Sequence, residues 1–203
     1  MAFLSARLAR ACKPLAVWGV SVAWILGFAL ELVPASDLAA QAAQAARPSE
    51  YQVKAVFLFN FAQFVDWPPE AVADSQAPLT IGVLGENPFG DVLDATVRGE
   101  RRGARSFVVR RYQRVEDIKI CDILFISRPE GDRPEGVLAD LKRRPILTVS
   151  DADGFAEHGG MIGFVTDRNR IRLKINLGVV QAAHLTISSK LLRVAEIINP
   201  PGP

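Results

Sequence analysis

The chain has 203 residues, a formal net charge of +2 at pH 7 and 49% hydrophobic residues. A balance of charges this close to neutral argues against a dedicated nucleic-acid-binding protein, which would carry a strongly basic face. The length suits one domain with a sizeable core, and no internal repeat or low-complexity tract follows residue 50. We therefore expect one globular domain without a nucleic-acid partner.

The N-terminal segment has the layout of a secretory signal peptide. Three basic residues within the first 13 positions precede an uncharged, mostly apolar run, Leu15–Leu30, and Ala43-Gln44-Ala45 fits the pattern that signal peptidase accepts. The apolar run has 16 residues, whereas a spanning helix prefers about 20, so a cleaved signal peptide is favoured over a retained membrane anchor. We expect residues 1–46 to be the signal peptide and residues 47–203 to form a domain on the exported side.

A long apolar helix is predicted to open the exported domain. Ser49 can cap it, and Gln52 follows three residues later, as in a capping box. The helix is expected to continue until Pro68-Pro69, and its few polar residues fall within one sector of the helical wheel. A helix this apolar is buried on most sides, either in its own core or partly against another chain.

Short apolar strands then alternate with helices. Such alternation is typical of a parallel α/β sheet with helices on both faces. The predicted strands cover residues 79–85, 106–111, 122–127 and 145–150, and the predicted helices cover residues 91–97 and 134–142.

Cys121, just before the third predicted strand, is the only cysteine outside the predicted signal peptide. An intrachain disulfide is therefore excluded in the exported domain. A leftover cysteine in an exported chain is either buried or available for intermolecular pairing. The apolar neighbours between Ile120 and Ile126 favour burial, in which the thiol behaves as a small hydrophobic group.

A β-hairpin and two helices are predicted to complete the domain. Met161–Val165 and Ile171–Leu177 read as strands, and Asp167–Arg170 is the polar turn between them. Helices are expected over 178–184 and 188–199, the last ended by two prolines. The predicted fold is thus a single α/β domain with a largely parallel sheet flanked by helices, a C-terminal β-hairpin that extends the sheet antiparallel, and C-terminal helices.

None of the short motifs that suggest chemistry has the required pattern. Gly85–Gly90 lies between a strand and a helix but lacks both the P-loop ending and the dinucleotide-binding spacing, and Asp151–Gly154 lacks the later ligands of a calcium loop. His158 and His184 have no second ligand at zinc spacing, and Ser188 reads as a helix cap rather than a nucleophile. The sequence therefore predicts no catalytic residue, no metal site and no cofactor.

The two faces of the second hairpin strand differ in chemistry. One face is assigned to the core and the other to the outside: Ile171, Leu173, Ile175 and Leu177 on the first, and Arg170, Arg172, Lys174 and Asn176 on the second. The outer cations form a row roughly 6.5–7 Å apart, which suits an acidic strip on a partner, and a late hairpin at a sheet edge can dock another chain. We hypothesise that these three cations, with nearby Phe155, contribute to a partner or dimer surface; the alternative is a face that is only solvated.

Six blocks of sequence, taken in order, resemble the YfiR family of periplasmic proteins. The series GGMI, INL and ISSKLL is their most specific part. The blocks extend over about residues 50–198 and read YQVKAVFLFNFAQFVDWP, VLGENPFG, CDILFIS, ILTVSDADGFAEHGGMIGFV, RIRLKINL and LTISSKLLRVA.

The resemblance implies a periplasmic α/β domain, often a homodimer, without catalytic activity. The best-known members of the family bind the periplasmic region of an inner-membrane diguanylate cyclase and repress it, and an outer-membrane lipoprotein with a peptidoglycan-binding domain relieves that block. The implied function is repression in cyclic-di-GMP signalling. Because the family is broad and some members accompany sensor kinases, a periplasmic small-ligand binding or sensor protein stays open as the alternative.

The chain departs from the family pattern at one place. The resemblance implies a second cysteine in the first strand, placed to bridge to the cysteine before ILFIS. In this chain the first strand reads Leu79-Thr80-Ile81-Gly82-Val83, so Cys121 stands alone and no such bridge is expected.

Overall fold

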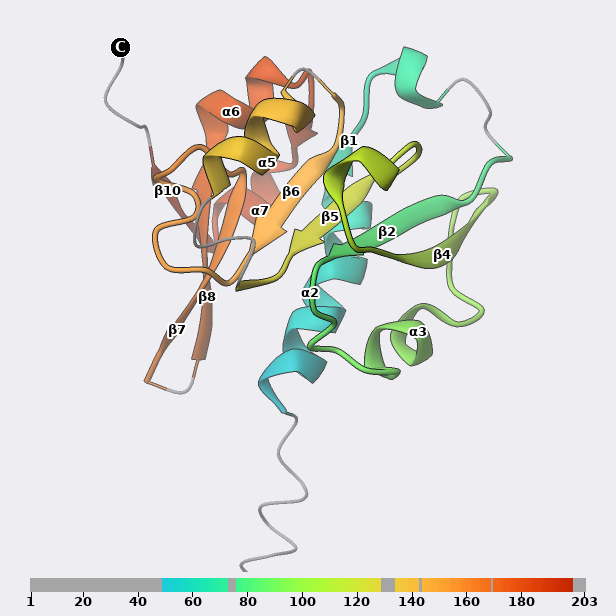
Figure 1. Ribbon diagram of the computed structural model, residues 1–203, viewed down its shortest axis with the longest axis horizontal. Coiled ribbons are helices and arrows are strands. Elements are labelled where there is room, and N and C mark those ends of the chain that lie inside the picture. Colours follow the sequence, from blue (N-terminus) through green and yellow to red (C-terminus); the bar gives the residue numbers. More distant parts are fainter. Residues whose placement is uncertain (1–48, 73–75, 129–133, 143, 169, 199–203) are drawn as a thin grey trace, which may run out of the picture. The chain divides into compact units, whose positions relative to one another are not determined.

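The computed structural model is an α/β domain built on one eight-stranded sheet (Figure 1). Within the described residues, the predicted fold class is confirmed. The predicted signal peptide lies outside them, as do the last residues of the chain. The structure describes residues 49–72, 76–128, 134–142, 144–168 and 170–198.

Five parallel strands form the main part of the sheet, in the order β4-β2-β5-β6-β7. This is the flavodoxin-like order, in which ligands bind beyond the carboxyl ends of the strands. The three central strands are buried along their whole length, as expected where helices cover both faces. The strands are β2 (Leu79–Leu84), β4 (Arg105–Tyr112), β5 (Ile123–Ile126), β6 (Leu147–Ser150) and β7 (Ile162–Asp167).

Antiparallel pairs extend the sheet on both sides. The strands β7 and β8 (Arg170–Asn176) form the predicted hairpin, which extends the sheet antiparallel as expected. At the opposite edge, the two-residue strand β3 (Arg101–Arg102) pairs with β4. A separate small ladder joins β1 (Val65–Asp66) to β9 (Thr186–Ile187).

The predicted helix over residues 188–199 is wrong in its second half. A short helix, α7 (Ser189–Leu192), ends after one turn, and the chain then forms β10 (Ala195–Ile198), which runs parallel to β8. Two β-branched residues close this segment, and pairing with β8 supplies the backbone hydrogen bonds that a helix would otherwise make. The outer edge of the described sheet therefore belongs to β10 and not to the hairpin.

Helices cover both faces of the sheet (Figure 1). The longest, α2 (Glu50–Phe64), has the predicted capping box: Ser49 Oγ accepts from the backbone N–H of Gln52 at 3.2 Å, and Gln52 Oε1 accepts from the N–H of Ser49 at 2.6 Å. Within the described ranges the other helices are α3 (Val92–Val97), α5 (Pro134–Leu141) and α6 (Leu177–Ala182), with single 3-10 turns η1 (Pro69–Val72) and η2 (Val115–Asp117).

Alternate side chains of a central strand serve two separate cores. In β5, Ile123 and Phe125 join the core that contains the buried face of α2, whereas Leu124 and Ile126 join the core on the opposite face. A slip of one residue would exchange the two sets of side chains, so burial on both faces fixes the register of the strand.

Cys121 lies in the core opposite α2. It is 8% exposed, forms no disulfide with another described residue, and burial raises the pKa of its thiol to about 12. The predicted burial is confirmed. Gly82 in β2 lies against it: a Cβ atom on Gly82 would be 2.8 Å from Cys121 Sγ and 2.8 Å from Tyr112 Cε2. This close approach leaves no room for a side chain at residue 82.

The two faces of β8 are expected to respond differently to mutation. Leu173 is 2% exposed and packs in the α2 core, whereas Arg172 is exposed. Leu173→Ala should lower the free energy of unfolding by about 2–5 kcal/mol through the cavity that it leaves. The matched control, Arg172→Ala, should change it by no more than about 0.5 kcal/mol. Urea unfolding measures both, and equal effects would contradict the assignment of the faces.

Candidate functional site

The outer face of the hairpin is less uniform than its sequence predicts. Arg170 and Arg172 are exposed, but Lys174 is partly covered and Asn176 is fully buried. The Asn176 side chain caps α6 and donates its Nδ2 hydrogen to the Ala156 carbonyl at 2.9 Å. The assignment of Asn176 to an outer face is therefore wrong, because the loop after β6 covers the base of the hairpin.

Two of the three predicted cations already have acidic partners. Arg172 Nη2 lies 3.3 Å from Asp167 Oδ2, and Lys174 Nζ lies 2.5 Å from Glu157 Oε1. Burial alone would raise the pKa of Glu157, but the hydrogen bond from Lys174 brings this pKa below its ordinary value, and the same contact raises the pKa of Lys174. The row thus presents less positive charge than its sequence suggests, and partner binding by Lys174, Arg172 and Arg170 stays a prediction.

Phe155 does not lie on the surface. It is 1% exposed in the core opposite α2, and its ring fills the space beside Gly160, where a Cβ atom would be 2.1 Å from Phe155 Cε1. The backbone N–H of Gly160 also donates to the Phe155 carbonyl at 2.9 Å, which closes the loop on itself. The prediction that Phe155 contributes to an exposed surface is therefore wrong, because the ring anchors the loop that covers the hairpin.

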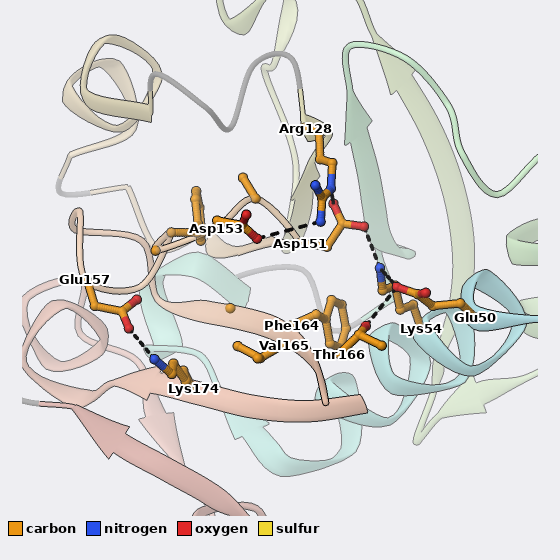
Figure 2. A pocket seen from close by; sticks show the side chains of 14 residues that line it. Glu50, Lys54, Arg128, Asp151, Asp153, Glu157, Phe164, Val165, Thr166 and Lys174 are labelled. Carbon is orange, nitrogen blue, oxygen red and sulfur yellow. Dashed lines mark hydrogen bonds and ion pairs between the residues drawn. The ribbon is translucent and has the colours of Figure 1, made fainter. Parts of the chain in front are cut away.

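A polar pocket of about 240 Å³ lies beside the hairpin (Figure 2). The start of α2, the segment after β5, the loop after β6, and strands β7 and β8 all contribute to its walls. Asp151 directly follows β6, and Arg128 lies two residues beyond β5. The pocket thus lies at the carboxyl-end side of β5 and β6, next to the switch point between β2 and β5 at which sheets of this order commonly bind ligands, and not at the switch point itself. We call it the carboxyl-end pocket.

A buried ion pair forms one wall of the carboxyl-end pocket. Lys54 is 1% exposed, and its Nζ lies 2.5 Å from Asp151 Oδ2 and 2.5 Å from Glu50 Oε1. Tyr51 donates its hydroxyl hydrogen to the same Asp151 oxygen at 3.0 Å, and burial together with the Asp151 charge raises the pKa of Tyr51 to about 12. The first two turns of α2 are thereby attached to the carboxyl edge of the sheet.

The other carboxylate oxygen of Asp151 lacks a hydrogen bond. The Asp151 side chain is 3% exposed, and its Oδ1 accepts no hydrogen bond from any residue that the structure describes. Arg128 lies close by, with its Nε 4.0 Å from Asp151 Oδ1 and its Nη2 3.8 Å from Asp153 Oδ1, both beyond hydrogen-bond distance. Because the Arg128 side chain is 57% exposed, its guanidinium is held only loosely between the two carboxylates.

A second contact connects α2 to the hairpin across the pocket. Thr166 of β7 donates its hydroxyl hydrogen to Glu50 Oε1 at 3.0 Å. The hydrogen bond from Lys54 is the main reason that the pKa of Glu50 lies below its ordinary value, and the bond from Thr166 acts in the same direction. Glu50 therefore stays ionised and holds the two walls together.

The sequence patterns did not predict this pocket, although the sequence contains a signal that could have indicated it. A lysine in the second turn of an apolar helix needs a buried acid, and an aspartate that directly follows an apolar strand is a natural candidate. Across the described ranges, no group of three or more His, Cys, Asp or Glu side chains could hold a metal ion. The charged and polar groups around this small cavity make it a candidate site for a small polar ligand.

Because the ion pair is buried, removal of one of its charges should destabilise the fold more than removal of both. Lys54→Met leaves the Asp151 carboxylate buried without its main cation, so the free energy of unfolding should fall by about 3–5 kcal/mol. Adding Asp151→Leu removes the isolated charge, and the double variant should be more stable than Lys54→Met alone. Glu50→Gln is the control, because the Glu50 side chain is 45% exposed and its pairing contributes at most about 1 kcal/mol. Urea unfolding of the single and double variants gives the coupling, and additive effects would contradict it.

Comparison with known proteins places the chain in a family. No helix within the described ranges is both long and apolar enough to cross a membrane. No curated protein matches the chain. A family model described as YfiR/HmsC-like matches residues 51–196, which include nearly all of α2, the parallel strands and the hairpin. A match over this much of the sequence shows that the chain belongs to the YfiR/HmsC-like family.

Proposed function

We propose that this protein is a non-catalytic periplasmic regulator that binds the periplasmic part of an inner-membrane diguanylate cyclase and represses it. The observation that carries the proposal is the family match over residues 51–196, the same region whose sequence blocks resemble the YfiR family. An outer-membrane lipoprotein that binds peptidoglycan is the proposed antagonist, and a homodimer is the proposed assembly.

The exposed end of the hairpin supports binding to an acidic partner. At this end of the hairpin, exposed arginines outnumber acidic side chains. A groove between the hairpin and β10 is lined by residues 170–173 and 193–196, and includes the exposed apolar side chain of Val194. We call this the hairpin surface, and its exposed cations are Arg168, Arg170, Arg172 and Arg193.

Export is part of the same proposal. The basic start, the apolar run and the alanine-rich end of residues 1–46 support a cleaved signal peptide. N-terminal sequencing of the protein recovered from the periplasmic fraction should give a chain that starts near Ala46. Recovery of a chain with an intact Met1 in the membrane fraction would instead support a retained anchor.

A second candidate function is a periplasmic small-ligand sensor associated with a sensor kinase. The observation that favours it is the carboxyl-end pocket, in which a buried carboxylate oxygen has no hydrogen bond from a described residue. The two candidates are compatible if ligand binding changes the affinity for the signalling partner.

Charge reversal on the hairpin surface tests the proposed partner contact. Arg170→Glu combined with Arg172→Glu should weaken binding to the purified periplasmic region of the cyclase by about tenfold or more at low salt, and less at high salt, because salt screens exposed charges. Cells that carry this variant should contain more cyclic-di-GMP than cells with the unaltered protein.

The matched control reverses two exposed arginines outside the hairpin surface, Arg98→Glu with Arg110→Glu. It makes the same change in net charge and should leave binding nearly unaltered. Equal losses for the two pairs would mean that net charge alone matters and that the hairpin surface is only solvated. Unchanged cyclic-di-GMP on deletion of the whole protein would contradict repression of a cyclase.

A further inference from the structure

We propose that the carboxyl-end pocket binds a small organic cation, an alkyl ammonium or guanidinium compound, with Asp151 Oδ1 and the Asp153 carboxylate as its acceptors. The inference develops the second candidate function and rests on the pocket alone. It does not require the hairpin surface or a cyclase partner.

The first observation is that one carboxylate oxygen of Asp151 lacks a hydrogen-bond donor while the other is fixed in place. Lys54 and Tyr51 both donate to Oδ2 and leave the side chain 3% exposed, so the carboxylate cannot turn to satisfy its other oxygen. Oδ1 accepts nothing from the residues that the structure describes and is itself buried, so a ligand reaches it by displacing a neighbour such as Arg128. A buried, ionised acceptor without a donor is unfavourable, and a ligand N–H group placed there would remove the penalty.

The second observation concerns how the charges of the pocket are paired. Lys54 and Lys174 each have a carboxylate at 2.5 Å, so their charges are already satisfied. Lys54 is shared between Glu50 and Asp151, so of the described acidic groups around the pocket only Asp151 Oδ1 and the Asp153 carboxylate are left, and both lie near Arg128, at 4.0 and 3.8 Å. The pocket is lined by four acidic and three basic side chains, and this excess of acid favours a cation over an anion.

Arg128 itself indicates the chemistry of the ligand. Its guanidinium lies between the two carboxylates without making a hydrogen bond to either, and more than half of its side chain is exposed. An entering cation that makes hydrogen bonds of ordinary length can displace it toward solvent. Arg128 thus acts as a loosely bound competitor inside the protein, and its removal should strengthen the binding of a cation but weaken the binding of an anion.

The size and walls of the pocket set the size of the ligand. The pocket volume of about 240 Å³ is smaller than that of sites for drug-sized molecules, which start at about 300 Å³. Figure 2 shows Arg128, Asp151 and Asp153 together, with Phe164 and Val165 across the cavity from them. The two acceptor carboxylates, with two apolar side chains opposite them, suit a short aliphatic chain with a cationic end.

The test uses agmatine, which carries both a guanidinium and an ammonium group, and succinate as a small, shorter dianion. Isothermal titration of the mature protein should detect agmatine binding and no succinate binding. In Arg128→Ala the affinity for agmatine should rise by about fivefold or more, because the competing cation is gone. Asp153→Asn should lower that affinity, and it is a safe variant because the Asp153 side chain is 97% exposed and outside the core.

Arg114→Ala is the matched control, since Arg114 is an exposed arginine paired with an aspartate away from the pocket, and it should leave agmatine affinity unchanged. The proposal is overturned if neither the unaltered protein nor Arg128→Ala binds agmatine at millimolar concentration. It is also overturned if Arg114→Ala tightens binding as much as Arg128→Ala, or if succinate binds and Arg128→Ala abolishes that binding. Cyclic-di-GMP in cells with Arg128→Ala is measured separately, so that failure of the pocket and failure of cyclase repression are distinguished.

Discussion

The ion pair between Lys54 and Asp151 determines how the longest helix sits on the sheet. Apolar packing holds α2 against the core, but its apolar residues surround most of the helix and provide little to fix its position along the strands. The pair adds a contact with one geometry, since a displaced helix would leave two buried charges unpaired. The same contact orients Asp151, forms a wall of the carboxyl-end pocket and, through Glu50, connects α2 to β7.

The carboxyl-end pocket and the hairpin surface are built on the same two strands. Thr166 of β7 and Lys174 of β8 line the pocket, while the next residues toward the hairpin turn carry the exposed arginines. Lys174 also pairs with Glu157 in the loop that covers the base of the hairpin. A ligand that moved this loop would therefore act directly on the hairpin, and the two proposed functions have a physical route by which they can be coupled.

Local patterns predicted most of the fold. Ser49 and Gln52 mark the start of α2, and the apolar runs of β2, β5 and β6 are long enough and regular enough to identify buried parallel strands. The errors arise where long-range contacts determine the secondary structure or the burial of a residue. β10 is a strand because β8 lies beside it, and Asn176 is buried because the Ala156 carbonyl needs its side chain.

The site was harder to predict than the fold for the same reason. Alternation along β8 correctly separated Leu173 from Arg172, because a strand imposes that pattern on neighbouring residues. Lys54 and Asp151 are 97 residues apart, and no local pattern connects them. Phe155 was wrongly expected on the surface because the fold of its loop around Gly160 depends on tertiary packing.

The close approach of Gly82 to Cys121 has a consequence for oxidation. A separation of 2.8 Å between a Cβ atom at residue 82 and Cys121 Sγ is close to the roughly 3 Å that the same atoms span across a disulfide. Gly82→Cys would bring a second sulfur within bonding reach only if the side chains of Tyr112 and Leu124 both moved aside, and it would then close a loop of about 40 residues that constrains the unfolded chain by about 4 kcal/mol. With glycine there instead, β2 and its neighbours are held by packing and hydrogen bonds, and no pairing between these described strands depends on the oxidation state of Cys121.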